Sequence, residues 1–140
     1  MTGKRRKGIQ MTIPETHADI LDKKSFAQWA TIGPKGEPQV NPVWFEWDGE
    51  HIVISQTKTR QKFRNVQREP RVAVSILDPD DPYRYLEIRG EVAGIEDDEG
   101  NAFINRMAKK YLGQDEYQWD PPGAERIVVR IEPKDTTTMG

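Results

Sequence analysis

Six basic side chains are concentrated in one short part of a slightly acidic chain. The 140 residues carry a formal charge of −2. The stretch SQTKTRQKFRNVQREPRVAV nevertheless holds a single acidic residue beside Lys58, Arg60, Lys62, Arg64, Arg68 and Arg71. Ser55, Thr57 and Thr59 add hydroxyl groups at its start. Because hydroxyls and guanidinium groups are donors that suit phosphate, this composition predicts an anion site.

A short helix is expected to position these donors. It would begin at Thr59, which is placed to cap it, and end before the proline of the REP segment. Phe63 and Val66 would face inward, while Arg60 and Arg64, four residues apart, would share an outer face. The free N–H groups and dipole of a helix N-terminus favour an anion. We infer a phosphate or phosphodiester on a small molecule, with a solvated charged face as the alternative.

Composition and motifs exclude several other kinds of chemistry. The chain has no cysteine, so thiolate metal sites and disulfides are impossible. His17 and His51 are the only histidines, which excludes a histidine-rich metal centre. Walker A, GxGxxG, GxSxG and HExxH motifs are absent, and the net charge argues against general nucleic-acid binding. The aspartates of the DPDDP loop are interpreted as a solvated turn, so no metal site is expected.

The chain is expected to be a cytoplasmic protein that does not contact membranes. No apolar run approaches the ~18 residues of a membrane helix, and the basic start lacks the apolar segment of a secretory signal. Residues 1–11, which include Lys4, Arg5, Arg6 and Lys7, are predicted to be a disordered basic extension. Residues 12–135 would then form one domain.

Residue patterns predict about six strands and three helices, in the order helix, three strands, helix, two strands, helix, strand. The first helix would start at Thr12, and the third would end at Gly113, a typical C-cap. Asp48-Gly49 predicts a two-residue hairpin turn, and Gly90 marks a bulge in a long strand. The last residues are expected to fray. Antiparallel hairpins with inserted helices favour a mainly β fold, a β-barrel with helical decoration.

One strand offers aromatic side chains on both of its faces. Val43, Phe45 and Trp47 alternate on one face and are expected in the core. Trp44 points to the opposite face, which makes it the better candidate for a cleft. A phosphate site beside this strand would suit a flat ring with a phosphorylated tail.

Two segments together resemble a known superfamily. They are GEPQVNPVWFEWDGEHIVIS and TRQKFRNVQREPRVAVSILDPDDPYRYLEIRGEVAGI. In order and spacing they are similar to the pyridoxamine-phosphate-oxidase-like split β-barrel superfamily of flavin and deazaflavin binders, over roughly residues 14 to 133. The resemblance is strongest to the actinobacterial-type branch of F420-dependent oxidoreductases, in which a K-x-R-N-hydrophobic element precedes PRVA.

The resemblance implies a six-stranded, FMN-binding-protein-like split barrel that forms a homodimer with two cofactor clefts at the subunit interface. The strand from Val40 to Trp44 would contact the deazaflavin ring, Ile76 to Pro79 would line the same cleft, and the partner's loop around Trp119 would close it. The residues implied to bind cofactor are Val40, Asn41, Pro42, Val43, Trp44, Ser55, Thr57, Arg60, Lys62, Arg64, Ile76, Leu77, Asp78, Pro79 and Trp119. No catalytic side chain is expected, because the cofactor carries the hydride chemistry.

Three functions are consistent with this resemblance. The first is a reductase that moves a hydride between reduced coenzyme F420 and a conjugated small molecule. The others are an FMN-dependent enzyme and a protein that binds or stores F420 without turnover. Because the deazaflavin carries a polyglutamate tail, extra cations such as Lys58 and Arg64 favour it over FMN. The sequence does not indicate the substrate.

Overall fold

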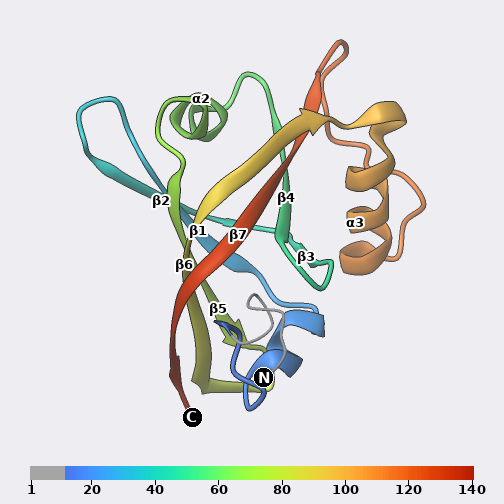
Figure 1. Ribbon diagram of the computed structural model, residues 1–140. Helices are drawn as coiled ribbons and strands as arrows, with labels where there is room; N and C mark the ends of the chain where they lie inside the picture. The colour runs from blue at the N-terminus through green and yellow to red at the C-terminus, as the bar shows by residue number, and fades with distance from the viewer. Residues whose placement is uncertain (1–11) are drawn as a thin grey trace.

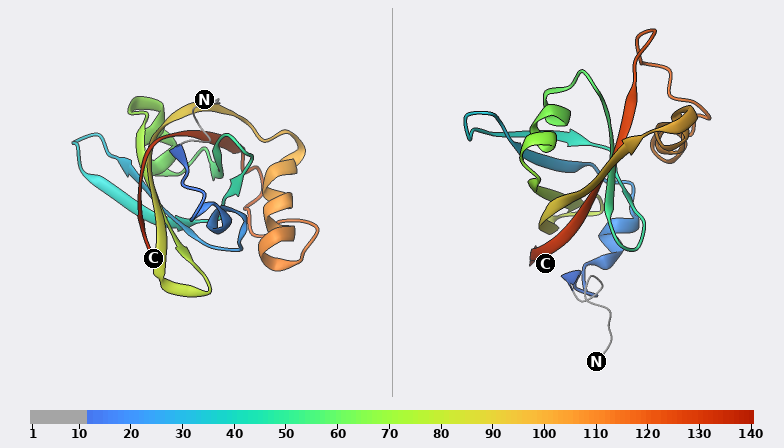
Figure 2. Two further views of the ribbon diagram at one scale, coloured as in Figure 1. Left: turned by 60° about the horizontal axis from the view of Figure 1, so that its bottom comes forward. Right: turned by 45° about the horizontal axis from the view of Figure 1, so that its top comes forward.

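A curled antiparallel sheet with two α-helices at its rim makes up the molecule (Figures 1 and 2). The computed structural model describes residues 12–140. Its strands are β1 (Ala27–Ile32), β2 (Pro38–Val43), β3 (Glu46–Trp47), β4 (Ile52–Thr57), β5 (Arg71–Asp78), β6 (Asp81–Asp97) and β7 (Arg126–Met139). They are arranged in the order β2-β1-β5-β6-β7-β4-β3, and each neighbouring pair is antiparallel. The prediction of a mainly β, antiparallel fold is confirmed.

The described residues form seven strands, not six, because one predicted strand is divided. The chain leaves β2 after Val43 and enters β3 at Glu46. β2 pairs with β1, whereas β3 pairs with β4 at the other edge of the sheet. The hairpin predicted at Asp48-Gly49 is present, but its loop is longer than two residues. The Asp48 carboxylate accepts hydrogen bonds from the N–H groups of Glu50 and His51 there.

Two of the three predicted helices are α-helices, and the first is not. It is a five-residue 3-10 helix, η1 (Ala18–Asp22), that begins later than Thr12 and buries Ile20 and Leu21. α2 (Gln61–Arg68) has Arg60 at its N-cap, with no side-chain cap bond, so the predicted capping role of Thr59 is wrong. A 3-10 turn, η2 (Glu99–Asn101), leads into α3 (Ala102–Leu112). α3 ends at Gly113 in the left-handed conformation, as predicted.

Two long strands give the sheet its curl (Figure 1). β7 pairs with β4 along its first half and with β6 along its whole length, so it connects both parts of the sheet. The β6–β7 register shifts at Gly90, where a Cβ atom would collide with the Glu132 carbonyl oxygen. The predicted bulge is therefore confirmed, and only glycine fits it. The expected fraying is wrong, because β7 stays paired with β6 up to Met139.

The concave side of the sheet encloses the main hydrophobic core. Its largest members include Trp29, Phe45, Ile54, Ile76 and Leu86, all fully buried. Val43 and Trp47 pack against this core, as the alternation predicted. A second, smaller cluster joins α3 to the sheet through the buried side chains of Val53, Phe103, Ile104, Met107, Tyr111 and Val128.

Ion pairs fasten η1 to the β5–β6 hairpin. Asp78 is buried and accepts hydrogen bonds from Lys23 Nζ and Arg84 Nη1, both at 2.8 Å. Arg84 also bonds both carboxylate oxygens of Asp19 in η1. These bonds hold the pKa of the Asp78 carboxyl well below its usual range, with the Lys23 bond contributing most. The prediction of a solvated turn is therefore wrong for Asp78.

Two further properties concern only residues 12–140. No helix there is long and apolar enough to cross a membrane. No group of three or more His, Cys, Asp or Glu side chains is arranged to hold a metal ion in this part of the chain. The predicted extension at residues 1–11 lies outside the described residues.

Candidate functional site

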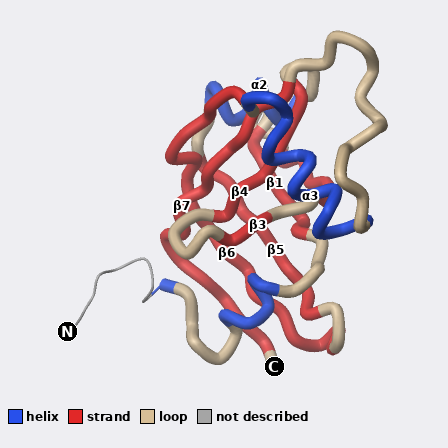
Figure 3. The backbone as a smooth tube through the Cα atoms, turned by 90° about the vertical axis from the view of Figure 1, so that its right-hand side faces the viewer, coloured by secondary structure: helices blue, strands red, loops and turns tan. Residues whose placement is uncertain are grey.

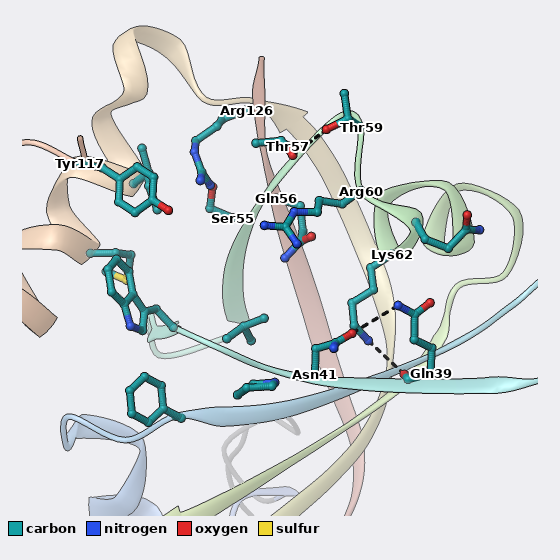
Figure 4. Close-up of a pocket in the computed structure, with 17 residues that line it drawn as sticks. Gln39, Asn41, Ser55, Gln56, Thr57, Thr59, Arg60, Lys62, Tyr117 and Arg126 are labelled. Atoms are coloured by element: carbon teal, nitrogen blue, oxygen red, sulfur yellow. Dashed lines mark hydrogen bonds between the residues drawn. The ribbon is translucent and has the colours of Figure 1, made fainter. Parts of the chain in front are cut away.

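A cleft of about 630 Å³ opens between β2, β4, α2 and α3 (Figure 4). Seventeen residues line it: Phe26, Gln39, Asn41, Pro42, Val43, Trp44, Ser55, Gln56, Thr57, Thr59, Arg60, Gln61, Lys62, Ile104, Met107, Tyr117 and Arg126. One end is polar and cationic, and the other is aromatic and apolar. The volume falls within the ~300–1,000 Å³ that is usual for small-molecule sites.

Charge at the cleft is one-sided. Arg60, Lys62 and Arg126 contribute three cations, whereas no aspartate or glutamate is among the described residues that line it. The Arg60 guanidinium is exposed, extends into the cleft, and has no hydrogen-bond or ion-pair partner within residues 12–140 (Figure 4). The hydroxyls of Thr57 and Thr59 lie beside it, 3.2 Å apart. Such a set of unneutralised donors is suited to an anion.

Lys62 has an unexpected environment. Only 4% of the residue is exposed, and its Nζ donates to the carbonyl oxygens of Trp29 at 2.6 Å and Gln39 at 3.0 Å. It also lies over the Trp29 ring, 5.1 Å from the centroid. Burial lowers the pKa of Lys62 to about 8. The side chain therefore connects α2 to β1 and β2 and also adds positive charge to the floor of the cleft.

Arg126, the first residue of β7, closes the polar end. Its Nε and Nη2 donate to the two carboxylate oxygens of Asp120, at 2.6 and 3.0 Å. Its Nη1 donates to Ser55 Oγ at 2.9 Å. The guanidinium also stacks over the Tyr117 ring, 4.6 Å from the centroid. This one side chain links the cleft wall to the segment that precedes β7.

The apolar end is built on stacked aromatic rings. Trp44 lies parallel to Tyr111, with centroids 5.1 Å apart, and Tyr117 meets Trp44 edge-on at 5.9 Å. The Tyr111 hydroxyl is buried, donates to the Ser25 carbonyl oxygen and accepts from the Phe45 N–H. Burial raises the pKa of this phenol to about 12. Trp44 is thus held as a rigid wall on the face that strand alternation indicated.

Eight of the fifteen predicted residues meet in this cleft: Asn41, Pro42, Val43, Trp44, Ser55, Thr57, Arg60 and Lys62. The other seven do not line it. Val40 is 58% exposed, and Trp119 is 59% exposed. Arg64 is exposed and donates to the Thr59 carbonyl and Gln61 Oε1. Ile76 is in the core, Leu77 and Pro79 are exposed, and Asp78 is ion-paired, so their role stays a prediction.

Sequence reasoning missed the wall contributed by α3 and by the segment before β7. Ile104 and Met107 belong to the apolar face of α3, whose periodicity indicates burial but not a cleft. Tyr117 is half-buried against Trp44 and Arg126. Gln39 is the second residue of β2 and Gln61 is the first residue of α2. Neither has a sequence pattern that indicates a place in the cleft. The position of Arg126 at the start of a strand likewise does not indicate from the sequence that it lines the cleft.

A curled antiparallel sheet with a cleft that is cationic at one end and aromatic at the other is typical of split-barrel proteins that bind a cofactor. The chain belongs to the pyridoxamine 5'-phosphate oxidase family, whose sequence model matches residues 13–140. A solved structure described as an F420 reductase is 39% identical, with 89% of this chain and 98% of that chain covered and a TM-score of 0.80. The resemblance to the F420-dependent branch is thereby confirmed.

Other solved structures share the fold. A conserved hypothetical protein from Mycobacterium tuberculosis is 26% identical, with 98% of this chain and 89% of that chain covered and a TM-score of 0.69. General stress protein 26 from Bacillus anthracis is 19% identical, with coverage of 89% and 92% and a TM-score of 0.67. The second of these likenesses concerns the fold alone.

Proposed function

We propose that the protein is an F420-dependent oxidoreductase that transfers a hydride between reduced coenzyme F420 and a conjugated small molecule. The observation that carries the proposal is the cleft itself. At one end Arg60 and Lys62 have no acidic partner among the described residues, and at the other end stacked aromatic rings form the wall. The 39% identity to a structure described as an F420 reductase supports the same choice of cofactor. The donor set fits a phosphorylated ring compound.

The polar end would hold the phosphate. Arg60 is free to rotate its guanidinium toward the ligand, because no described residue engages it. The hydroxyls of Thr57 and Thr59 would donate to phosphate oxygens, and Lys62 would contribute its charge from below. Charge-assisted hydrogen bonds of this kind are the strongest that a protein makes to a ligand.

The apolar end would receive the ring. Trp44, Met107 and Ile104 exclude water on one side, and the main chain of β2 from Asn41 to Val43 passes beside them. When bound, the deazaflavin supplies the hydride-transfer chemistry. No histidine, aspartate or glutamate is among the described residues of the cleft, so the protein's task would be to bind, orient and exclude water.

We place the second half of the predicted site in the partner of a homodimer. Exposed apolar side chains outside the cleft include Val40, Leu77, Tyr83 and Trp119. Large exposed apolar side chains are typical of interaction surfaces. In a dimer, the region of Leu77 and the loop around Trp119 would complete the other subunit's cleft. Sedimentation at micromolar concentration tests this, and a monomer would contradict the shared cleft.

FMN is the second candidate cofactor, because the family model is that of a flavin-type oxidase. Titrating the purified protein with F420 and with FMN, followed by absorbance and fluorescence, separates the two. We expect tighter binding of F420. Nanomolar FMN affinity without any response to F420 would transfer the assignment to FMN.

Turnover separates an enzyme from a storage protein. The protein should accelerate oxidation of reduced F420 by a panel of conjugated acceptors, as measured by the return of the oxidised cofactor's absorbance. Arg60→Ala, assayed at subsaturating cofactor, is the matched control for a reaction that depends on the cleft. Tight binding without acceleration by any acceptor would favour storage.

A further inference from the structure

Arg126 connects two parts of the molecule. One part is the cleft, which Arg126 lines. The other is the irregular segment 113–125, which runs back along α3 before β7 begins (Figures 1 and 3). We name residues 113–125 the return segment. Only 9% of the Arg126 side chain is exposed, so its interactions are shielded from bulk water.

The guanidinium divides its donors between the two parts. Nε and Nη2 form a two-point pair with the Asp120 carboxylate, which belongs to the return segment and does not line the cleft. Nη1 faces the opposite way and donates to Ser55 Oγ in the cleft wall. A second hydrogen on Nη1 remains for a ligand. Arg126 can therefore hold Asp120 and an anion at the same time.

The return segment has few other attachments near this point. Between Gln118 and Ala124, the Asp120–Arg126 pair provides the only hydrogen bonds to the barrel within the described part of the chain. Earlier in the segment, the Tyr117 N–H donates to Asn105 Oδ1 at 2.8 Å, and its ring lines the cleft. Loss of the pair would leave residues 118–124 without a hydrogen bond to the barrel among the described residues, next to Tyr117.

We propose that Asp120 and Arg126 form a latch that couples an anion in the cleft to closure of the return segment. The proposal rests on the proposed function, in that the anion is the cofactor's phosphate. Asp120 fixes the guanidinium so that Nη1 is aimed at Ser55 and the bound anion. The anion in turn adds a bond to Arg126 and so stabilises the segment that carries Tyr117. Coupling of this kind is reciprocal by thermodynamic necessity.

Asp120→Asn tests the latch without touching the cleft, and Asp115→Asn is its matched control. Asp115 lies in the same segment and pairs with Lys109 at 3.3 Å, but it is 91% exposed. We expect Asp120→Asn to weaken F420 binding by roughly tenfold, within the usual range of coupling between sites, and Asp115→Asn by less than twofold. In an Arg126→Gln background, Asp120→Asn should have no further effect, because the coupling passes through Arg126.

Hydrogen exchange supplies a readout that a purely structural pair would not change. In the wild type, saturating F420 should slow amide exchange in residues 116–125. In Asp120→Asn, saturating F420 should leave that exchange unchanged. Equal slowing in both proteins, or unchanged F420 affinity in Asp120→Asn, would overturn the latch.

Inorganic pyrophosphate distinguishes failure of the latch from failure of the proposed cofactor. If the wild type binds neither F420 nor FMN, the proposed function is wrong. The latch still stands in that case if pyrophosphate slows exchange of residues 116–125 in the wild type but not in Asp120→Asn. It falls if pyrophosphate leaves the wild-type exchange unchanged.

Discussion

Positive charge is used differently at the two ends of the barrel. At the η1 end, Lys23 and Arg84 are saturated by Asp19, Asp78 and Asp80, in bonds of 2.6 to 3.0 Å. At the cleft end, Arg60 and Lys62 have no acidic partner within residues 12–140. The sequence alone does not show this difference, because both regions are rich in charged residues.

The contrast separates cations that hold the fold from cations that await a ligand. A buried carboxylate that loses its cation is left uncompensated, which is strongly destabilising. An exposed guanidinium with no partner contributes little to folding, so its removal should be felt only when an anion binds. Substitutions at the η1 end should therefore lower stability and leave cofactor affinity unchanged. Substitutions at the cleft end should lower cofactor affinity and leave stability unchanged.

The largest expected effect on folding is that of Arg84→Met. It removes the bonds to Asp19 and Asp78 and leaves the buried Asp78 carboxylate with one cation, Lys23, and the hydrogen bond from the Asp80 N–H. We expect a fall of several degrees in the thermal midpoint, with unchanged F420 affinity of the folded protein. Arg89→Met is the control on the same strand, since Arg89 is half-exposed, its ion pairs are 3.3 Å and 3.5 Å long, and its hydrogen bond to the Thr137 hydroxyl lies on the surface. Equal midpoints for both variants would contradict a structural role for the network.

Acid should reveal the same network. The pKa of Asp78 is lowered in the folded protein, so its contribution to stability is present above its unfolded pKa and lost as pH falls below about 4. Arg84→Met should flatten this acid dependence, as measured by urea unfolding between pH 3 and pH 6.

Arg60→Ala should produce the largest loss of cofactor affinity with little change in folding. A charge-assisted hydrogen bond contributes about 1.5–3 kcal/mol, which corresponds to a roughly 10- to 100-fold weaker binding of F420. Arg64→Ala is the matched control, because Arg64 lies one turn along α2 and does not line the cleft. Titration at low and high salt should show that affinity depends on salt less in Arg60→Ala. Equal losses in both variants would indicate diffuse attraction rather than a phosphate contact.

The elements that the sequence predicted well are those with a strong local pattern. The four-residue spacing of Phe103, Met107 and Tyr111 marked α3, and Gly113 marked its end. The break between β2 and β3 was not predictable, because Val43 to Trp47 keeps an unbroken strand-like alternation. The break is imposed by tertiary structure, since β1 and β4 are each second from opposite edges of the sheet and each requires its own edge strand as a partner.

The parts of the candidate site that depend on residue type could be predicted from the sequence. The parts that depend on which side chains the fold buries and brings together could not. Hydroxyls and arginines before a helix indicated the anion end. Lys62 was expected to be a simple phosphate ligand, but its bonds to Trp29 and Gln39 carbonyls give it a structural role that only the fold reveals. Arg126 enters the cleft because β7 pairs with β4 and brings it beside Ser55, a contact between residues 71 positions apart.

Lys62 both holds the fold, through its bonds to the Trp29 and Gln39 carbonyl oxygens, and adds positive charge to the cleft. The pH dependence of stability and of cofactor affinity should separate these two roles. Because an anion binds the charged ammonium better, F420 affinity should fall as pH rises through about 8. Stability of the cofactor-free protein should change in the opposite direction. The pKa of Lys62 is lower when folded than its unfolded value of 10.5, so the unfolded state binds more protons between pH 8 and 10.5, and stability rises across that window.

Lys62→Met should remove both trends. The variant also leaves two carbonyl groups without their donor, so the slopes against pH are to be compared, not the absolute values. Ionisation of the cofactor itself affects both proteins equally and cancels in the comparison. Identical pH slopes of affinity in the wild type and the variant would mean that Lys62 has no electrostatic role in binding.

The smallest expected effect concerns a cation at the edge of the cleft. Lys58 lies between two cleft residues, Thr57 and Thr59, and pairs with Asp97 across 3.3 Å on the surface. Such an exposed pair contributes little to folding, so Lys58→Ala should leave the thermal midpoint unchanged. If the polyglutamate tail of F420 leaves the cleft on this side, the variant should bind F420 about two- to threefold more weakly, because exposed charges are screened within ~10 Å at 0.1 M salt. FMN, which has no such tail, should be unaffected.

Lys109→Ala removes a lysine from an equally long surface pair on α3, away from Arg60, and should change neither affinity. A loss that is the same for F420 and FMN would assign Lys58 to the phosphate end, and no loss for either would direct the tail elsewhere.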